Sequence, residues 1–114
     1  MNHRDTQICL KILSEASVLR ELLAQMTEAQ FMADERTVRA VCMTLINIGE
    51  LVKNITPELR SAHPEIPWRA IAGMRDVTAH KYQTLRKDDV FRTCTDDIPV
   101  FVRQLQKLLN AEKI

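Results

Sequence analysis

The chain has 114 residues, 46% of them hydrophobic, with two glycines, four prolines and a formal net charge of +1. This length suits a single domain over residues 1–114, and a helix-forming composition without two-residue alternation favours an all-α fold. The near-neutral charge excludes a general nucleic-acid coat, and no apolar run approaches the roughly 18 residues of a membrane span. Because the N-terminus leads into a charged helix and not into the apolar core of a signal peptide, we expect a cytoplasmic protein.

Apolar residues recur in steps of four and three over residues 5–26, which predicts a first helix with one buried face. Residues 27–33 include Thr27, Glu28 and Gln30, and this interval is interpreted as a polar turn. A second stripe of the same kind predicts a helix over residues 34–55. Gly49 lies inside this stripe, where it either permits the close approach of another helix or leaves a packing gap.

A helix-start signature follows at Thr56, Pro57 and Glu58. Threonine can cap a helix, proline fits the first helical position, and a carboxylate favours the positive helix end. The helix that begins here is expected to be short, because two later X-Pro pairs restrict the backbone. Pro67 can then open a third principal helix over residues 68–79, which is only partly apolar.

Asp88 is a candidate cap for the last helix, whose apolar residues step by four and three from Val90 to Leu108. Pro99 removes a backbone donor, so it is expected to kink or split this helix. The predicted architecture is therefore an all-α, four-helix up-and-down bundle with one short extra connecting helix.

The chain has three cysteines and three histidines. No two cysteines form a CxxC pair, and the histidines make no zinc-binding pattern. We therefore expect reduced thiols in the core, no metal site and no cofactor. These residues are Cys9, Cys42, Cys94, His3, His63 and His80.

One polar cluster stands apart from the apolar stripes, the sequence RDVTAHKY at residues 75–82. Asp76 and His80 are four apart, so on a helix the carboxylate could hold the imidazole in one tautomer and favour its protonated form. Arg75 and His80 are five apart, or about 140° around an ideal helix, and would not converge within one continuous helix. Either the helix ends near Ala79 or a second subunit completes the site.

This cluster has the residue types that RNA cleavage requires. The guanidinium of Arg75 suits phosphate oxygens, and the imidazole of His80 can transfer protons near neutral pH. Together they suffice, without a metal, for attack of a 2′-hydroxyl on the adjacent phosphodiester, with Arg75 stabilising charge in the transition state. Spacing alone leaves a structural alternative open, in which Arg75 pairs with a neighbouring helix, His80 caps a helix end and Tyr82 packs.

The sequence around the cluster is locally basic. From Arg60 to Lys87 there are six basic side chains against two acidic ones. Such a stretch is often only a solvated face, but it could also bind the RNA backbone. The candidate RNA-binding residues are Arg69, Lys81, Arg86 and Lys87.

The pattern of Arg75, His80 and Tyr82 matches the RxxxxHxY motif of the HEPN superfamily. The surrounding sequence resembles the HepT branch, which comprises HepT-like ribonuclease toxins encoded beside MNT-type minimal nucleotidyltransferase antitoxins. The stretches that carry this resemblance are IGE at 48–50, TPELR at 56–60, HPEIPWR at 63–69 and IAGMR at 71–75.

The resemblance implies an all-α homodimer with Arg75 and His80 as the catalytic pair, facing a shared cleft and cleaving RNA without metal. Asp76 supports the site at a position where asparagine is frequent in relatives, and its carboxylate either orients His80 or repels phosphate. In such systems the partner nucleotidyltransferase can transfer AMP to the motif tyrosine, which is Tyr82 here. AMP would place bulk and negative charge where RNA phosphate binds, which explains inhibition.

The sequence therefore indicates an endoribonuclease toxin with RNA as substrate and a nucleotidyltransferase antitoxin as partner. Two other interpretations remain open. One is a non-catalytic HEPN module that binds a nucleotidyltransferase partner or nucleotide without cutting RNA. The other is a plain dimeric helical interaction domain, in which Trp68 and its helix bury against another subunit or within the same chain.

Overall fold

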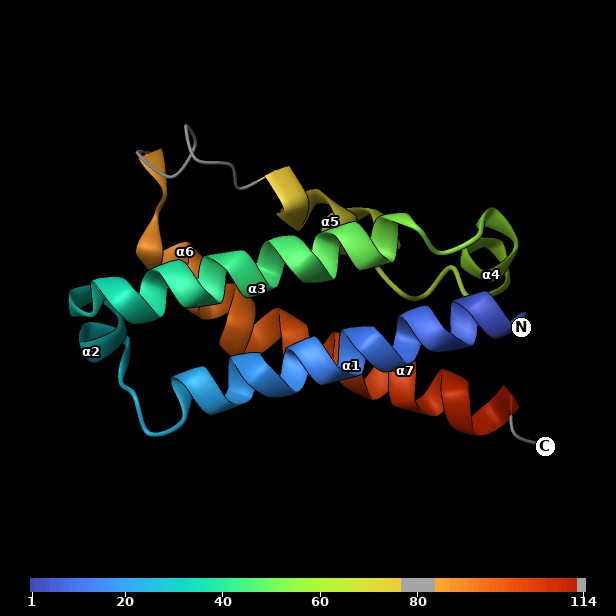
Figure 1. Ribbon diagram of the computed structural model, residues 1–114, viewed down its shortest axis with the longest axis horizontal. Helices are drawn as coiled ribbons and strands as arrows, with labels where there is room; N and C mark the ends of the chain where they lie inside the picture. Colours follow the sequence, from blue (N-terminus) through green and yellow to red (C-terminus); the bar gives the residue numbers. More distant parts are fainter. Residues whose placement is uncertain (77–83, 113–114) are drawn as a thin grey trace.

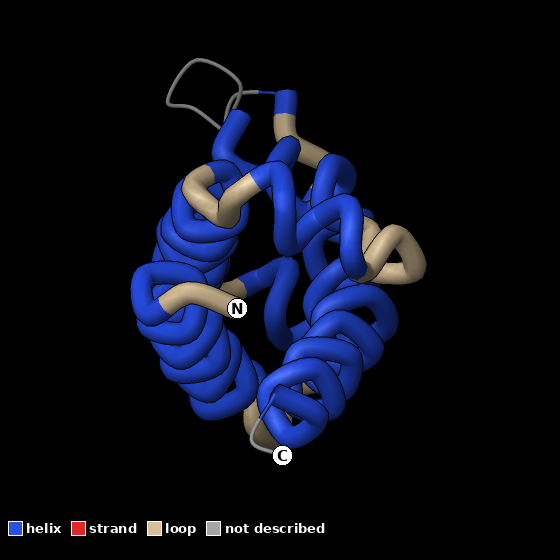
Figure 2. Tube along the Cα trace, turned by 90° about the vertical axis from the view of Figure 1, so that its right-hand side faces the viewer, coloured by secondary structure: helices blue, strands red, loops and turns tan. Residues whose placement is uncertain are grey.

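The computed structural model describes residues 1–76 and 84–112, and all regular secondary structure in these ranges is helical. Three long helices run side by side along the longest axis, and shorter helices close the ends and one side (Figure 1). The view turned by 90° shows the helices surrounding a common interior (Figure 2). The elements are α1 (His3–Leu23), α2 (Glu28–Ala33), α3 (Glu35–Lys53), α4 (Pro57–Ala62), α5 (Trp68–Ala72), the 3₁₀ helix η1 (Gly73–Asp76), α6 (Lys87–Arg92), the π-helix η3 (Thr93–Asp97) and α7 (Ile98–Glu112).

The first predicted helix is confirmed, although α1 ends at Leu23 and not at residue 26. Its end is followed by Gln25 with φ 66°, a left-handed conformation that an α-helix cannot contain. The prediction of a turn over residues 27–33 was wrong, because this interval contains α2. Thr27 and Gln30 form a reciprocal capping box, with bonds of 3.1 and 2.9 Å, and this sequence signal had been overlooked.

The second predicted helix corresponds to α3, which Asp34 caps by accepting a hydrogen bond of 3.1 Å from the Thr37 backbone N–H. That hydrogen bond holds the pKa of the Asp34 carboxyl below its usual value. The helix-start signature at residue 56 is also confirmed. Thr56 caps α4 by accepting from the Leu59 N–H at 3.3 Å, and Pro57 occupies the first turn.

The third principal helix is shorter than the sequence predicted. Its α-helical part, α5, ends at Ala72, and the chain continues as the tighter helix η1. The Gly73 backbone N–H bonds to the carbonyls of Arg69 and Ile71, a mixed pattern typical of a helix tightening at its end. Residues 77–79 of the predicted helix lie outside the described residues.

The last helix begins two residues earlier than predicted, because Arg86 and not Asp88 is the N-cap, and Asp88 lies inside the first turn of α6. The expected split at Pro99 is confirmed. The helix widens into η3 and resumes as α7 at Ile98, so that Pro99 falls in the first turn of α7, where a missing N–H costs least.

The core lies between α1, α3 and α7, and α5 with η1 covers the remaining side by packing on α3. The all-α expectation is thus confirmed, but a fourth long helix is replaced by these two short elements. The three cysteines are buried, unpaired thiols, as expected. Phe31 in α2 is fully buried, which the sequence analysis missed together with the helix itself. No described helix is long and apolar enough to cross a membrane.

Candidate functional site

The polar cluster lies at the end of the α5–η1 segment. The backbones of Arg75 and Asp76 form the last part of η1, which packs against α3. Their side chains, and all of His80, Lys81 and Tyr82, lie outside the described residues. The expected pairing of Asp76 with His80, and the approach of Arg75 to His80, therefore stay predictions. The structure does describe how the chain is attached to the bundle on either side of the polar cluster, upstream through α5 and downstream through α6.

The upstream end is attached through α5. Trp68 is 5% exposed and makes an edge-to-face contact with Phe101 of α7, with ring centroids 6.2 Å apart. Its indole Nε1 donates a hydrogen bond of 2.9 Å to the His63 backbone carbonyl. A buried tryptophan with its polar atom satisfied is a firm anchor. Of the two locations expected for Trp68, the structure shows burial within the same chain.

At the α3–α4 corner, hydrogen bonds from Arg60 join α4 to the C-terminal end of α3. Arg60 donates from Nη2 to the carbonyls of Val52 and Lys53, both at 2.9 Å. This arginine satisfies carbonyls at the C-terminal end of α3, where the helix leaves acceptors without intrahelical partners. One of the six cations that made this stretch basic is therefore committed to the fold and not to a surface for RNA.

Asp5 provides a second support at the same corner. Its side chain is 1% exposed, and it accepts hydrogen bonds from the Thr56 backbone N–H at 3.1 Å and from Thr56 Oγ1 at 2.6 Å. This contact was not predicted from the sequence. A signal was present, because Asp5 precedes Ile8, Ile12 and Ala16 on the buried stripe of the first helix.

A groove of about 770 Å³ separates α5 and η1 from η3 and α7. Most of the residues that line this groove are apolar, and two acidic residues, Glu65 and Asp97, also line it. Gly73 leaves it open, since a Cβ built there would meet no heavy atom within 4 Å. Gly73 and Met74 line the groove and immediately precede Arg75, so the groove adjoins the backbone that carries the catalytic candidate.

The downstream end is attached through the start of α6. The ammonium of Lys87 lies 3.4 Å from Glu35 Oε2 and 3.4 Å from the Met32 carbonyl oxygen. Phe91, one turn further, contacts the buried ring of Phe31 with centroids 5.5 Å apart. Both contacts join α6 to the corner between α2 and α3.

The expected RNA-binding cations differ in their surroundings. Arg86 pairs with Asp88 at 3.3 Å and with Asp89 at 3.5 Å, and Lys87 pairs with Glu35. Arg69 is exposed on α5, and no ion pair involves it among the side chains that the structure describes, which exclude that of Asp76. Of the expected RNA-binding residues that the structure describes, Arg69 alone presents a charge not offset by a neighbouring carboxylate in that part of the chain.

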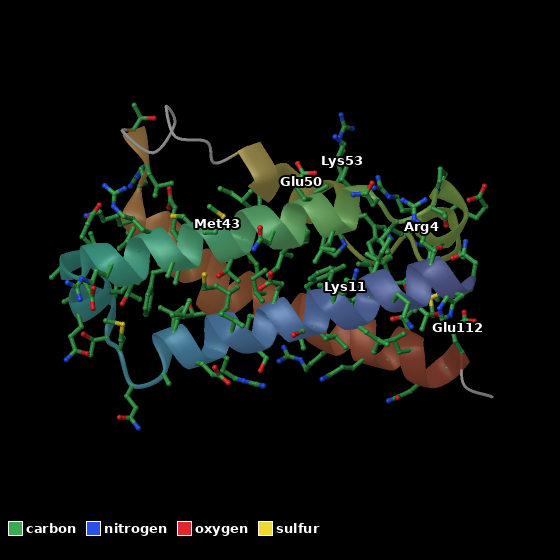
Figure 3. The ribbon with its side chains drawn as sticks, viewed as in Figure 1. Arg4, Lys11, Met43, Glu50, Lys53 and Glu112 are labelled. Carbon is green, nitrogen blue, oxygen red and sulfur yellow. The ribbon has the colours of Figure 1, made fainter. Side chains whose placement is uncertain are left out.

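Lys53 is an exposed cation near α5 that was not among the expected RNA-binding residues. Lys53, in the last turn of α3, projects away from the bundle on the side where α5 lies (Figure 3).

The buried thiols are unsuited to nucleophilic or metal chemistry. Burial raises the pKa of Cys9 to about 11, with a smaller contribution from Asp5, and that of Cys94 to about 12, with a smaller contribution from Cys42. These thiols stay protonated at neutral pH. In the described part of the chain, no group of histidine, cysteine or acidic side chains is arranged to hold a metal ion.

Comparison with known proteins places this chain in a family. The "Ribonuclease HepT-like" family matches residues 12–108. A protein of Caldanaerobacter subterraneus subsp. tengcongensis named "Putative RNase" is 35% identical over 102 residues, covering 90% of this chain and 91% of its own. The "Probable ribonuclease HepT" of Thermococcus cleftensis is 34% identical, covering 94% of this chain and 96% of its own. No solved structure matches the chain significantly.

Proposed function

Because this chain belongs to the HepT-like ribonuclease family, we propose that it is a metal-independent endoribonuclease with Arg75 and His80 as its catalytic pair. The observation that carries the proposal is the family match over residues 12–108, which includes both residues and the RxxxxHxY pattern they form. RNA is the substrate class that the names of the relatives imply.

In the proposed reaction His80 takes the proton of a ribose 2′-hydroxyl, and the oxygen attacks the adjacent phosphorus. The bond from phosphorus to the 5′-oxygen breaks, leaving a 2′,3′-cyclic phosphate, and a proton returns to the departing oxygen. Arg75 stabilises the negative charge on the phosphoryl oxygens in the transition state. DNA, which has no 2′-hydroxyl, should not be cleaved.

The described geometry supports this proposal in two ways. First, η1 packs against α3 and follows an α5 that the buried Trp68 anchors, so the backbone of Arg75 belongs to an element attached to the core. Catalytic groups need such positioning, because small displacements cost much of the rate. Second, Arg69 is an exposed cation on α5, the helix that continues into η1, and it is a candidate contact for the RNA backbone.

Two further parts of the proposal concern assembly. We propose a homodimer in which two copies of the motif face one cleft, as the resemblance to HepT-like proteins implies. We also propose that an MNT-type nucleotidyltransferase is the antitoxin, and that Tyr82 accepts AMP from it. In that step the tyrosine oxygen attacks the α-phosphorus of ATP and pyrophosphate leaves, which adds negative charge beside the site.

The main experiment measures cleavage of a labelled single-stranded RNA by the purified protein in EDTA. The wild type should cut, whereas His80→Ala and Arg75→Ala should lose most activity at unchanged melting temperature. A DNA strand of the same sequence is the control substrate. Intact RNA with folded wild-type protein would refute the enzymatic proposal and favour a non-catalytic binding module.

The modification proposal is tested with the partner nucleotidyltransferase and ATP. The mass of the wild type should rise in multiples of AMP, and Tyr82→Phe should abolish the increase because Tyr82 is the single tyrosine of the chain. Labelling that survives Tyr82→Phe would exclude this site. For the dimer, light scattering should give twice the chain mass of 13.1 kDa, and a mass of one chain would exclude the shared cleft.

A further inference from the structure

After residues 77–83, which carry His80 and Tyr82 and are called the catalytic segment below, the structure describes the chain again from Thr84, and α6 begins three residues later. Lys87 is its first helical residue, five positions after Tyr82 and seven after His80. Lys87 is therefore close in sequence to the proposed catalytic histidine. A contact that fixes α6 against the rest of the bundle fixes the described helix that follows the catalytic segment.

Lys87 makes such a contact with two different elements. Its ammonium donates to the Met32 carbonyl in α2 and to the Glu35 carboxylate in the first turn of α3, both at 3.4 Å. The partners lie 52 and 55 positions away in sequence. An ammonium with three donors can serve both acceptors at once, so it fixes α6 at the corner between α2 and α3.

The neighbouring arginines do not do this. Arg86 pairs with Asp88 and Asp89, and Arg92 pairs with the same two carboxylates at 3.4 and 3.7 Å. These ion pairs stay within α6 and its cap, so they support the helix itself without joining it to another element. Among the described cations of residues 84–92, Lys87 alone forms a hydrogen bond or ion pair with another helix in the described part of the chain.

We propose that Lys87 is a positioning residue for the catalytic segment, and not a phosphate-binding residue as its place in a basic stretch predicted. By joining α6 to Met32 and Glu35 it fixes the downstream attachment of the segment, while η1 on α3 fixes the upstream one. The inference rests on the proposed ribonuclease function for its kinetic consequence, but the contact itself can be tested without activity.

The two roles predict different kinetics for Lys87→Met, which keeps an apolar stem and removes the charge. Loss of positioning should lower kcat by about two- to fivefold, the size expected for a partly exposed ion pair, with KM for RNA unchanged within about twofold. Loss of a phosphate contact should instead raise KM and weaken RNA binding. Arg92→Met, which removes a cation from the same helix, is the matched control and should leave kcat unchanged.

The salt dependence of RNA binding separates the roles further. In the His80→Ala background, which avoids cleavage, the slope of log Kd against log salt should be the same with Lys87 and with Lys87→Met. A decrease in slope of about one would indicate a lost phosphate contact and would overturn the proposal.

Coupling between Lys87 and Glu35 is the decisive kinetic measurement. Glu35→Gln should lower kcat less than Lys87→Met, because the Met32 contact survives, and the double variant should be no slower than Lys87→Met alone. Effects that multiply independently would show that the two residues do not act together and would overturn the proposal.

Hydrogen exchange tests the attachment without RNA. The Val90 amide, which bonds to the Arg86 carbonyl at 3.1 Å in the first turn of α6, should exchange faster in Lys87→Met than in Arg92→Met. Equal exchange in both would overturn the inference. If the wild type cleaves no RNA, the ribonuclease proposal fails on its own, and the exchange result still decides whether Lys87 fixes α6.

Discussion

Replacing Asp5 with alanine should lower the free energy of unfolding by about 3–4 kcal/mol. The side chain is 1% exposed and accepts two hydrogen bonds from Thr56, one from the backbone N–H and one from the hydroxyl. A hydrogen bond to a charged group contributes about 1.5–3 kcal/mol, and alanine also leaves the Thr56 N–H without its acceptor. The two hydrogen bonds together amount to about 3–6 kcal/mol. In the alanine variant water can replace part of what the Thr56 groups lose, so we expect a value in the lower half of that range.

The loss is large for a domain of this size, whose total stability is of the order of 5–15 kcal/mol. Urea denaturation followed by circular dichroism should show a lower midpoint with an unchanged slope. The melting temperature should fall by about 10–20 °C. Asp5→Asn keeps one acceptor oxygen and should lose about half as much, which gives a measurable folded variant if Asp5→Ala is too unstable.

A double-mutant cycle with Thr56→Val isolates the contact between the two side chains. Thr56→Val removes the hydroxyl that donates to Asp5 at 2.6 Å and that also caps the Leu59 N–H. Both single variants break the hydroxyl–carboxylate bond, so the double variant should be less destabilised than their sum by about 1.5–3 kcal/mol. Additivity within about 0.5 kcal/mol would refute the reasoning, and Thr56→Ser should stay within about 1 kcal/mol of the wild type.

Two further predictions concern stability near the candidate site and in the core. Gly73→Ala should stabilise the protein by about 0.4–1 kcal/mol without loss of RNA cleavage. The reason is that Gly73 has φ −63°, which alanine adopts without strain, and the new Cβ meets open space. A lower melting temperature in a thermal melt would contradict this prediction. Burial, with a smaller contribution from Cys42, raises the pKa of Cys94 from 9.0 to about 12, so the folded state keeps a proton that the unfolded state releases. This contribution to the free energy of unfolding is complete below pH 9 and is lost as pH rises towards 12. Urea denaturation between pH 9 and 10.5 should therefore show a smaller loss of unfolding free energy with pH in Cys94→Ala than in the wild type. The same loss in both proteins would exclude the effect.

Much of the helical scaffold could be predicted from local sequence. Several features depend on residues within a few turns of one another. They are the buried stripes of α1, α3 and α7, the cap at Thr56 and the split at Pro99. The capping box of Thr27 with Gln30 was equally local, and reading the interval only as polar missed α2. Periodicity and capping are therefore sufficient where the interaction partners are close in sequence.

The candidate site was predicted as residue types and not as geometry. The motif with Arg75, His80 and Tyr82 and the membership of the HepT-like family follow from the sequence, since both depend on identity and spacing. The surroundings did not follow. Lys87 looked like an RNA-binding cation because charge alone does not show which acceptor lies beside it, and its partner Glu35 is 52 positions away.

The sequence by itself determined the helical class, the buried faces and the chemical groups available for RNA cleavage. Only the tertiary structure decided that Asp5 supports Thr56, that Trp68 buries within its own chain, and that Lys87 joins α6 to α3. The physical reason is the range of each interaction. Helix periodicity and caps act within a few residues, whereas these contacts form only when the packed core brings distant helices together.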